Sequence, residues 1–194
     1  VITGDLIDKI AWLPQVCERL TTFAKQIPDG VDFILGNHEY HHDVNKVLDE
    51  LKHNTPMNIL VNSNIQIMGG KQPVYIAGVA YDNDREKEKR EAMIDKALSG
   101  IPDYAFVILL AHHPEFFEEA IERKIPLTLS GHTHGGQIVF MGMPLVPTGT
   151  PYTKGRYVEE QSVCYVNNGS GHWFPIRINC PREITVITFF DGVA

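Results

Sequence analysis

Four short segments of this sequence carry carboxylate, amide or imidazole side chains, and each segment follows an apolar run. They are Gly4-Asp5-Leu6-Ile7-Asp8, Gly36-Asn37-His38-Glu39, His112-His113-Pro114 and Gly131-His132-Thr133-His134-Gly135-Gly136. Oxygen and imidazole ligands together suit Mn, Fe, Zn or Ni better than the all-oxygen sites of Ca or Mg. The sequence therefore predicts a transition-metal site to which several separate turns contribute.

Other kinds of chemistry have less support. The sequence contains no Gly-x-Ser-x-Gly elbow and no Walker-type phosphate loop. Its three cysteines, Cys17, Cys164 and Cys180, are too few and too scattered for a disulfide framework or a thiolate zinc site. The formal net charge of −7 gives no electrostatic reason to bind nucleic acid.

An alternation of short strands and amphipathic helices must bring the four segments together. We expect strands at residues 1–3, 31–35, 106–111 and 127–130, each of which ends at one of the four segments. We expect helices near residues 10–24, 43–51 and 116–124. Ligand sites of α/β sheets assemble at the carboxyl ends of the strands, because the loops there converge on one edge.

The remaining sequence predicts a β-rich second half within a single domain. Strands are expected at residues 137–140, 162–166 and 183–190, joined by loops rich in Pro and Gly. The charge-dense residues 85–96 are interpreted as the solvated face of a helix. We find no internal repeat and no domain boundary, and 194 residues suit one domain spanning residues 1–194.

The order of these motifs resembles that of the calcineurin-like metallophosphoesterases. Further segments are similar to the bacterial YkuE-type branch of that family: Lys154-Gly155-Arg156-Tyr157, Val166-Asn167-Asn168-Gly169 and Asn179-Cys180-Pro181-Arg182-Glu183-Ile184. The resemblance covers nearly the whole sequence. It implies an α/β fold, the two-sheet, four-layer sandwich of the metallo-dependent phosphatases.

The resemblance also implies two divalent transition-metal ions (Mn, Fe, Zn or Ni). By position, Asp5 would bridge the ions, Asn37, His112 and His132 would complete the second site, and His134 would belong to the first. The family's Asp-x-His motif lies on a strand upstream of Gly-Asp, and this sequence begins after it. We therefore expect a fragment that lacks the first strand, with a complete second site and an impaired first site.

The activity implied by the resemblance is hydrolysis of phosphodiester or pyrophosphate-type bonds by in-line attack of a metal-bridging hydroxide. His38 would protonate the leaving group, while Asp8 would orient the Gly-Asp turn and Glu39 would support the ligands by hydrogen bonds. A non-catalytic protein-interaction module and a nuclease are the alternatives, and the acidic charge balance argues weakly against a nuclease. The partner is then a phosphate-ester substrate. The resemblance leaves open a cytoplasmic or membrane-associated bacterial protein, with membrane association through a segment upstream of this sequence.

Overall fold

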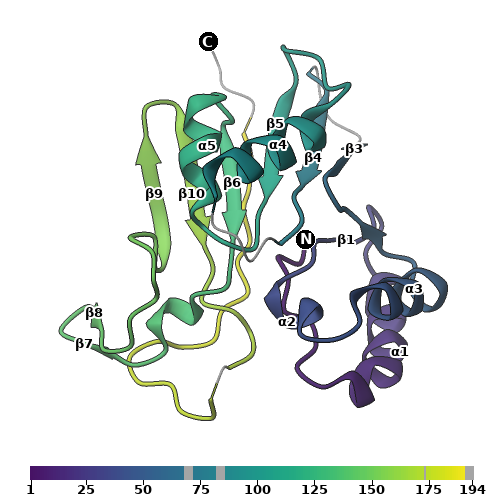
Figure 1. Cartoon of the computed structure of the whole chain (residues 1–194), viewed down its shortest axis with the longest axis vertical. Helices are drawn as coiled ribbons and strands as arrows, with labels where there is room; N and C mark the ends of the chain where they lie inside the picture. Colours follow the sequence, from purple (N-terminus) through teal and green to yellow (C-terminus); the bar gives the residue numbers. More distant parts are fainter. Residues whose placement is uncertain (68–71, 82–85, 173, 191–194) are drawn as a thin grey trace.

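Six strands form the largest sheet of the computed structural model, which describes residues 1–67, 72–81, 86–172 and 174–190 (Figure 1). The order along the sheet is β3 (Ser63–Ile67), β4 (Val74–Gly78), β5 (Phe106–Leu110), β6 (Leu127–Ser130), β10 (Ser162–Val166) and β9 (Gly155–Glu159). The four central strands are parallel, whereas β3 and β9 pair antiparallel at the edges. Parallel neighbours need crossover connections, and two helices lie in two of the three connections, those from β4 to β5 and from β5 to β6.

Those two helices, α4 (Lys87–Leu98) and α5 (Phe116–Glu122), cover one face of the six-stranded sheet. Successive side chains of a strand point to opposite faces, and β5 shows the consequence. Val107 and Leu109 pack with the buried helix residues Ile94 and Phe117, whereas Ile108 and Leu110 belong to the core on the other face. Both faces of β5 are therefore apolar, as expected for a central parallel strand.

A small parallel sheet lies against the second face. It consists of β1 (Asp32–Phe33) and β2 (Asn58–Ile59), and Ile2 forms an isolated parallel bridge to Phe33. Ile34 and Leu60 next to this sheet pack with residues of β4 and β5. The outer side of β1 is covered by α1 (Leu13–Ala24), which follows the 3-10 turn η1 (Ile10–Trp12), and by α3 (Val44–Asn54). The predicted two-sheet α/β sandwich is confirmed.

Several short elements lie near the carboxyl ends of the strands. These are the four-residue helix α2 (Asn37–Tyr40), the 3-10 turn η2 (His134–Gly136) and a hairpin of β7 (Val139–Phe140) and β8 (Met143–Pro144). The strands expected at residues 1–3 and 31–35 are shorter than predicted, because ladder pairing extends only to Ile2 and to β1. No helix among the described residues is long and apolar enough to cross a membrane.

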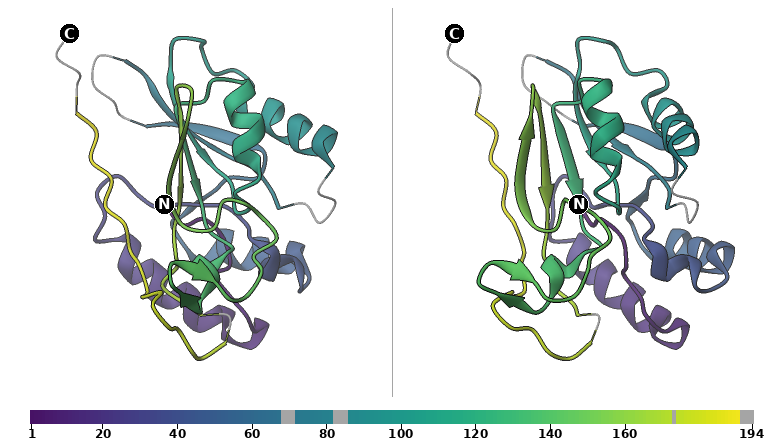
Figure 2. Two further views of the ribbon diagram at one scale, coloured as in Figure 1. Left: turned by 90° about the vertical axis from the view of Figure 1, so that its left-hand side faces the viewer. Right: turned by 60° about the vertical axis from the view of Figure 1, so that its left-hand side comes forward.

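The prediction of a strand at residues 183–190 is wrong. This segment is extended but forms no ladder in the described part of the chain, and Figure 2 shows it running along the sheet on the side away from α4 and α5. Glu183 N donates to Gly169 O at 3.1 Å, and Phe189 packs edge-on against Phe106. The physical reason is that β10, beside which the segment begins, already pairs with β6 and β9 along both of its edges.

Candidate metal centre

Four of the side chains singled out from the sequence meet where their strands end. Asn37 Oδ1 lies 3.0 Å from His112 Nε2 and 3.0 Å from His132 Nδ1. The two imidazole nitrogens are 3.2 Å apart, and Asp5 Oδ2 lies 3.2 Å from His112 Nε2. The site thus gathers one carboxylate, one amide oxygen and two imidazoles around a single point.

The hydrogen bonds around His112 indicate which of its ring nitrogens donates and which accepts. His112 Nδ1 lies 2.6 Å from Thr3 O, a carbonyl that can only accept, so the ring nitrogen there donates. In the neutral ring, Nε2 is then an acceptor, and it faces the acceptor atoms Asn37 Oδ1 and Asp5 Oδ2. Lone pairs that converge in this way need a positive charge between them, either a proton on His112 Nε2 or a bound metal cation. The donor set suits a divalent transition metal.

The carboxylate and the imidazoles of the cluster shift one another's pKa values. Burial opposes a charge on His112, but the hydrogen bond and the charge of Asp5 raise the pKa of His112 above its usual value. Burial would also raise the pKa of Asp5, yet the contact with His112 outweighs it and lowers that pKa. Burial lowers the pKa of His132 to about 3, with the neighbouring His113 and His112 contributing. His132 is therefore neutral, the form that binds a metal.

The backbone at the site adopts conformations that most residues avoid. Asp5, His132 and His134 have positive φ values of 56°, 67° and 50°. Such angles are uncommon for residues other than Gly, and they concentrate at functional sites. Gly36 is required for a different reason, because a Cβ atom there would lie 2.3 Å from Asp5 Oδ1. The turns that carry Asp5 and Asn37 approach each other too closely for any side chain at position 36.

A fully buried carboxylate holds the turn that carries Asp5. Glu39 accepts hydrogen bonds from four backbone N–H groups, those of Asp5 (3.0 Å), Leu6 (2.7 Å), Ile7 (3.3 Å) and Gly36 (2.6 Å). Burial raises the pKa of Glu39, the charge of Asp5 adds to this, and the backbone donors oppose it. Glu39 therefore fixes the Gly-Asp turn to the start of α2.

The role expected of Asp8 is wrong. Its side chain is largely exposed, and its carboxylate contacts the ring of His38, with Oδ1 3.2 Å from Nδ1, so that Glu39 orients the Gly-Asp turn instead. The sequence signal that could have shown this is the position of Glu39 on α2, where its side chain reaches back to the Gly36 N–H. Its bonds to Asp5 and Leu6 could not be foreseen, because they join residues more than 30 positions apart.

His38 lies at the edge of the cluster, with a carboxylate on each side of its ring. Nδ1 is 3.2 Å from Asp8 Oδ1, and Nε2 is 3.9 Å from Asp5 Oδ2. Its backbone N–H donates to Asp5 Oδ1 at 3.0 Å. The main chain of His38 thus supports the metal cluster, while its ring lies beside one of the converging ligand atoms, Asp5 Oδ2.

His134 faces the same cavity from another side. The cavity has a volume of about 200 Å³, and its lining includes Asp5, Asn37, His38, His132, His134, Gln137, Val146, Pro147 and Thr148. His134 Nδ1 lies 3.3 Å from Arg177 Nη2. Burial lowers the pKa of His134 to about 4, and the charge of Arg177 adds to this effect. His134 is therefore a neutral imidazole at the cavity wall, next to a cation.

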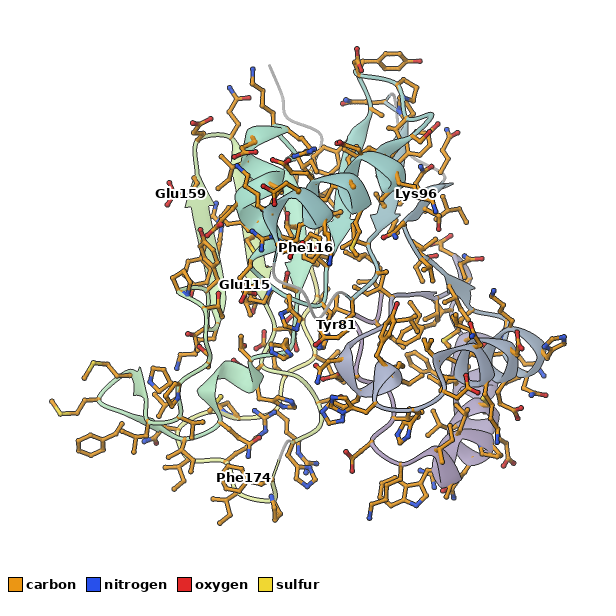
Figure 3. The ribbon with its side chains drawn as sticks, viewed as in Figure 1. Tyr81, Lys96, Glu115, Phe116, Glu159 and Phe174 are labelled. Carbon is orange, nitrogen blue, oxygen red and sulfur yellow. The ribbon has the colours of Figure 1, made fainter. Side chains whose placement is uncertain are left out.

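The sequence analysis assigned no role to His113, which the structure places beside the cluster. Its buried ring stacks on that of His132, with centroids 3.8 Å apart and planes 24° from parallel. One ring nitrogen from each of His112, His113 and His132 lies within 4.8 Å of the others. The adjacent pair His112-His113 was the only sequence signal. The Tyr81 ring is 5.0 Å from that of His113, and Glu115 Oε2 is 3.6 Å from His113 Nδ1; Figure 3 labels Tyr81 and Glu115.

Residues 38–42 match the His-Glu-x-x-His pattern of zinc proteases, although the sequence predicts no helix over this motif. That motif needs both histidines on one face of a helix, with the Glu free to act as a base. Here α2 ends at Tyr40, and His42 Nε2 contacts the carbonyl of Asp8. Glu39 is fully buried and bonded to backbone N–H groups. The structure thus excludes a zinc protease site at this motif.

Comparison with known proteins places the chain among metallophosphoesterases. The family model described as calcineurin-like phosphoesterase matches residues 1–136. An uncharacterized metallophosphoesterase of Campylobacter jejuni is 36% identical over 96% of this chain and 49% of its own length. The uncharacterized metallophosphoesterase YkuE of Bacillus subtilis is 39% identical over 50% of this chain and 39% of its own length.

The chain spans about half the length of the first of these relatives and of two similar proteins from Helicobacter pylori. Among solved structures, one from Staphylococcus aureus that carries the name of a 5′-nucleotidase superposes with a TM-score of 0.52. It is 11% identical, and the match covers 79% of this chain and 34% of that chain. At this level of identity the match concerns the fold alone.

Proposed function

This chain belongs to the calcineurin-like phosphoesterase family, and we propose that it is a metal-dependent hydrolase of phosphate esters. We further propose that it acts on phosphodiester or pyrophosphate-type bonds and uses two divalent ions. The observation that carries the proposal is the convergence of acceptor atoms from Asp5, Asn37, His112 and His132 on one point. A cluster of this kind is well suited to hold a cation and has no evident use in a purely structural role.

In this proposal the four converging side chains hold one ion, and Asp5 and His134 contribute to the other. When bound, such ions polarise a phosphoryl group and lower the pKa of a nucleophilic water. Glu39 contributes indirectly, since its four backbone bonds keep Asp5 in place. Val146, Pro147 and Thr148 also line the cavity.

We assign to His38 the protonation of the leaving oxygen. Both of its ring nitrogens face carboxylates, with Nδ1 3.2 Å from Asp8 Oδ1 and Nε2 3.9 Å from Asp5 Oδ2. The ring lines the cavity beside the converging ligand atoms. A leaving group positioned there could accept a proton from Nε2 within the geometry that general acid catalysis requires.

The test combines metal binding with hydrolysis. The metal-stripped chain is titrated with Mn²⁺ in a calorimeter, and hydrolysis of bis(p-nitrophenyl) phosphate is then followed with the metal added. We expect His112→Ala to weaken Mn²⁺ binding at least about 100-fold and to abolish Mn²⁺-dependent hydrolysis. His53→Ala serves as the matched control, because His53 is exposed on α3, where its ring nitrogen Nδ1 contacts the carbonyl of Asp49. Equal Mn²⁺ affinity in wild type and His112→Ala would refute the assignment.

The role of His38 is tested separately. His38→Ala retains the backbone N–H that supports Asp5, so Mn²⁺ affinity should stay close to that of wild type. Turnover should fall about 10²–10⁴-fold for alkyl phosphodiesters, which need a proton on the leaving oxygen. The loss should be much smaller for p-nitrophenyl esters, whose leaving group needs little protonation. Equal losses for the two substrates would contradict the assignment.

A further inference from the structure

An exposed apolar surface surrounds the β7–β8 hairpin. We call it the hairpin surface, and define it as the side chains of Phe140, Met141, Met143, Leu145, Ile176 and Ile178, which are 48–83% exposed. The surface comes from two chain segments, residues 140–145 and residues 176–178. Backbone contacts join these segments, since Val139 N donates to Ile178 O at 2.9 Å and Ile138 forms a β-bridge with Ile178. A contiguous group of large exposed apolar side chains marks an interaction site rather than ordinary surface.

The hairpin surface rests on a rigid base next to the metal centre. Gln137 is buried at the start of the hairpin, and its Nε2 donates to the carbonyls of Phe174 (2.6 Å) and Ile176 (2.9 Å). Gln137 also lines the cavity that holds the metal cluster. On the other side of the hairpin, Leu145 is followed at once by the cavity wall residue Val146. The surface therefore continues directly into the wall of the candidate active site.

The two chain segments that carry the hairpin surface contain basic residues and no acidic ones. All 24 acidic residues of the sequence lie outside residues 131–158 and 161–182, whereas Lys154, Arg156, Arg177 and Arg182 lie within those segments. The nearest acidic positions along the chain on the β9 side are Glu159 and Glu160. Figure 3 labels Glu159 near the top of the molecule, and Figure 1 places the β7–β8 hairpin at the bottom. An acidic protein thus carries the apolar hairpin on chain segments whose formal charges are all positive, bordered by Glu159, Glu160 and Glu183.

We propose that the hairpin surface docks this protein on an anionic lipid bilayer. The apolar hairpin side chains would enter the interface, and Lys154, Arg156 and Arg182 would supply the attraction to anionic headgroups. The shape favours a bilayer over a protein partner, because the hairpin projects from the body of the molecule (Figures 1 and 2). A projecting tip can insert among headgroups, whereas a protein interface of standard size needs a broad complementary area. The proposal concerns binding to a surface and does not depend on phosphoester hydrolysis.

The test is co-sedimentation of the 194-residue chain with large unilamellar vesicles. One set contains phosphatidylcholine alone, and the other contains about 30% phosphatidylglycerol. We expect at least about 10-fold tighter binding to the anionic vesicles, with a loss of binding as salt is raised. The double variant Met141→Asn/Met143→Asn should weaken that binding at least about 10-fold. Met141 has a φ of 48°, a conformation that Asn adopts readily, so the hairpin turn should persist.

Tyr104→Asn is the matched control. Tyr104 is 70% exposed in the loop before β5, outside the hairpin surface, and its replacement should leave vesicle binding unchanged. Far-UV circular dichroism and thermal midpoints establish that the variants are folded. Equal vesicle binding by the wild type and a folded double variant would overturn the proposal, as would failure of the wild type to bind anionic vesicles. A wild-type dimer that the double variant converts to a monomer, without vesicle binding by either, would show that the hairpin surface joins two copies instead.

Discussion

Replacing Glu39 by Gln would test how much the metal centre depends on a side chain outside the four converging ligands. Glu39 is fully buried, and its two carboxylate oxygens accept four backbone N–H groups, two on each oxygen. Gln has nearly the same shape but only one acceptor oxygen. In either orientation of the amide, its NH₂ group faces two N–H donors, from Leu6 and Ile7 or from Asp5 and Gly36.

The expected magnitude follows from those contacts. Two N–H groups lose their acceptor, and a buried donor left unsatisfied costs about 1–3 kcal/mol, so the loss is about 2–6 kcal/mol. One effect opposes this loss. Burial and the charge of Asp5 raise the pKa of Glu39, and a neutral Gln avoids the cost of burying that charge. We therefore expect a net destabilisation near the lower end of the range, at about 2–3 kcal/mol.

The assay is urea unfolding followed by circular dichroism in EDTA, so that metal binding does not contribute to the measured stability. A second measurement, calorimetric titration with Mn²⁺, should show about 10–100-fold weaker binding, because the turn that carries Asp5 is no longer fixed. Glu18→Gln on the exposed face of α1 is the control and should change neither quantity. A Glu39→Gln variant with wild-type stability and wild-type Mn²⁺ affinity would refute the reasoning.

Three further predictions follow from the site and the core. Gly36→Ala places a Cβ 2.3 Å from Asp5 Oδ1, so it should destabilise the chain by about 1–3 kcal/mol and weaken Mn²⁺ binding, whereas Gly171→Ala, with open space around it, should do neither. Arg177→Ala removes the donors to the carbonyls of His134, Asn168, Gly171 and Cys180, and should lower the free energy of unfolding by about 1–3 kcal/mol. Wild-type stability in Arg177→Lys would contradict a role for the guanidinium group. Burial raises the pKa of Cys164 to about 12, so at about pH 8 this thiol should react with a disulfide reagent only on unfolding, and rapid labelling of Cys164 in the native chain would contradict its burial.

Local features of the fold were readable from the sequence because they depend on neighbouring residues. The strands expected at residues 127–130 and 162–166 match β6 and β10. The helix expected at residues 43–51 corresponds to α3, whose N-cap Asp43 accepts from the N–H groups of Asn45 and Lys46. Capping and hydrophobic periodicity act within a few residues. A single sequence therefore carries this information in full.

The prediction of a strand at residues 183–190 was wrong because strand formation depends on residues far away in the sequence. An alternating apolar pattern indicates that a segment can join a sheet, but a strand exists only where a neighbour offers an unpaired edge. Both edges of β10 are taken by β6 and β9, so residues 183–190 stay extended beside the sheet. Whether an edge is free is a property of the assembled sheet.

In the candidate site, too, some features could be predicted from the sequence and others depend on the tertiary structure. The sequence alone determined which residue types stand at the ends of the strands, and its resemblance to the metallophosphoesterases grouped Asp5, Asn37, His112 and His132. Only the tertiary structure decided which side chains support them. Glu39 accepts hydrogen bonds from the Gly-Asp turn, more than 30 residues away in the sequence, and the ring of His113 stacks on that of His132. Arg177 donates to the carbonyl of His134. Such contacts join segments far apart in the chain, and their energies arise only when folding has brought the segments together. The types of chemical group available are thus written in the sequence, whereas their positions and charges are properties of the folded chain.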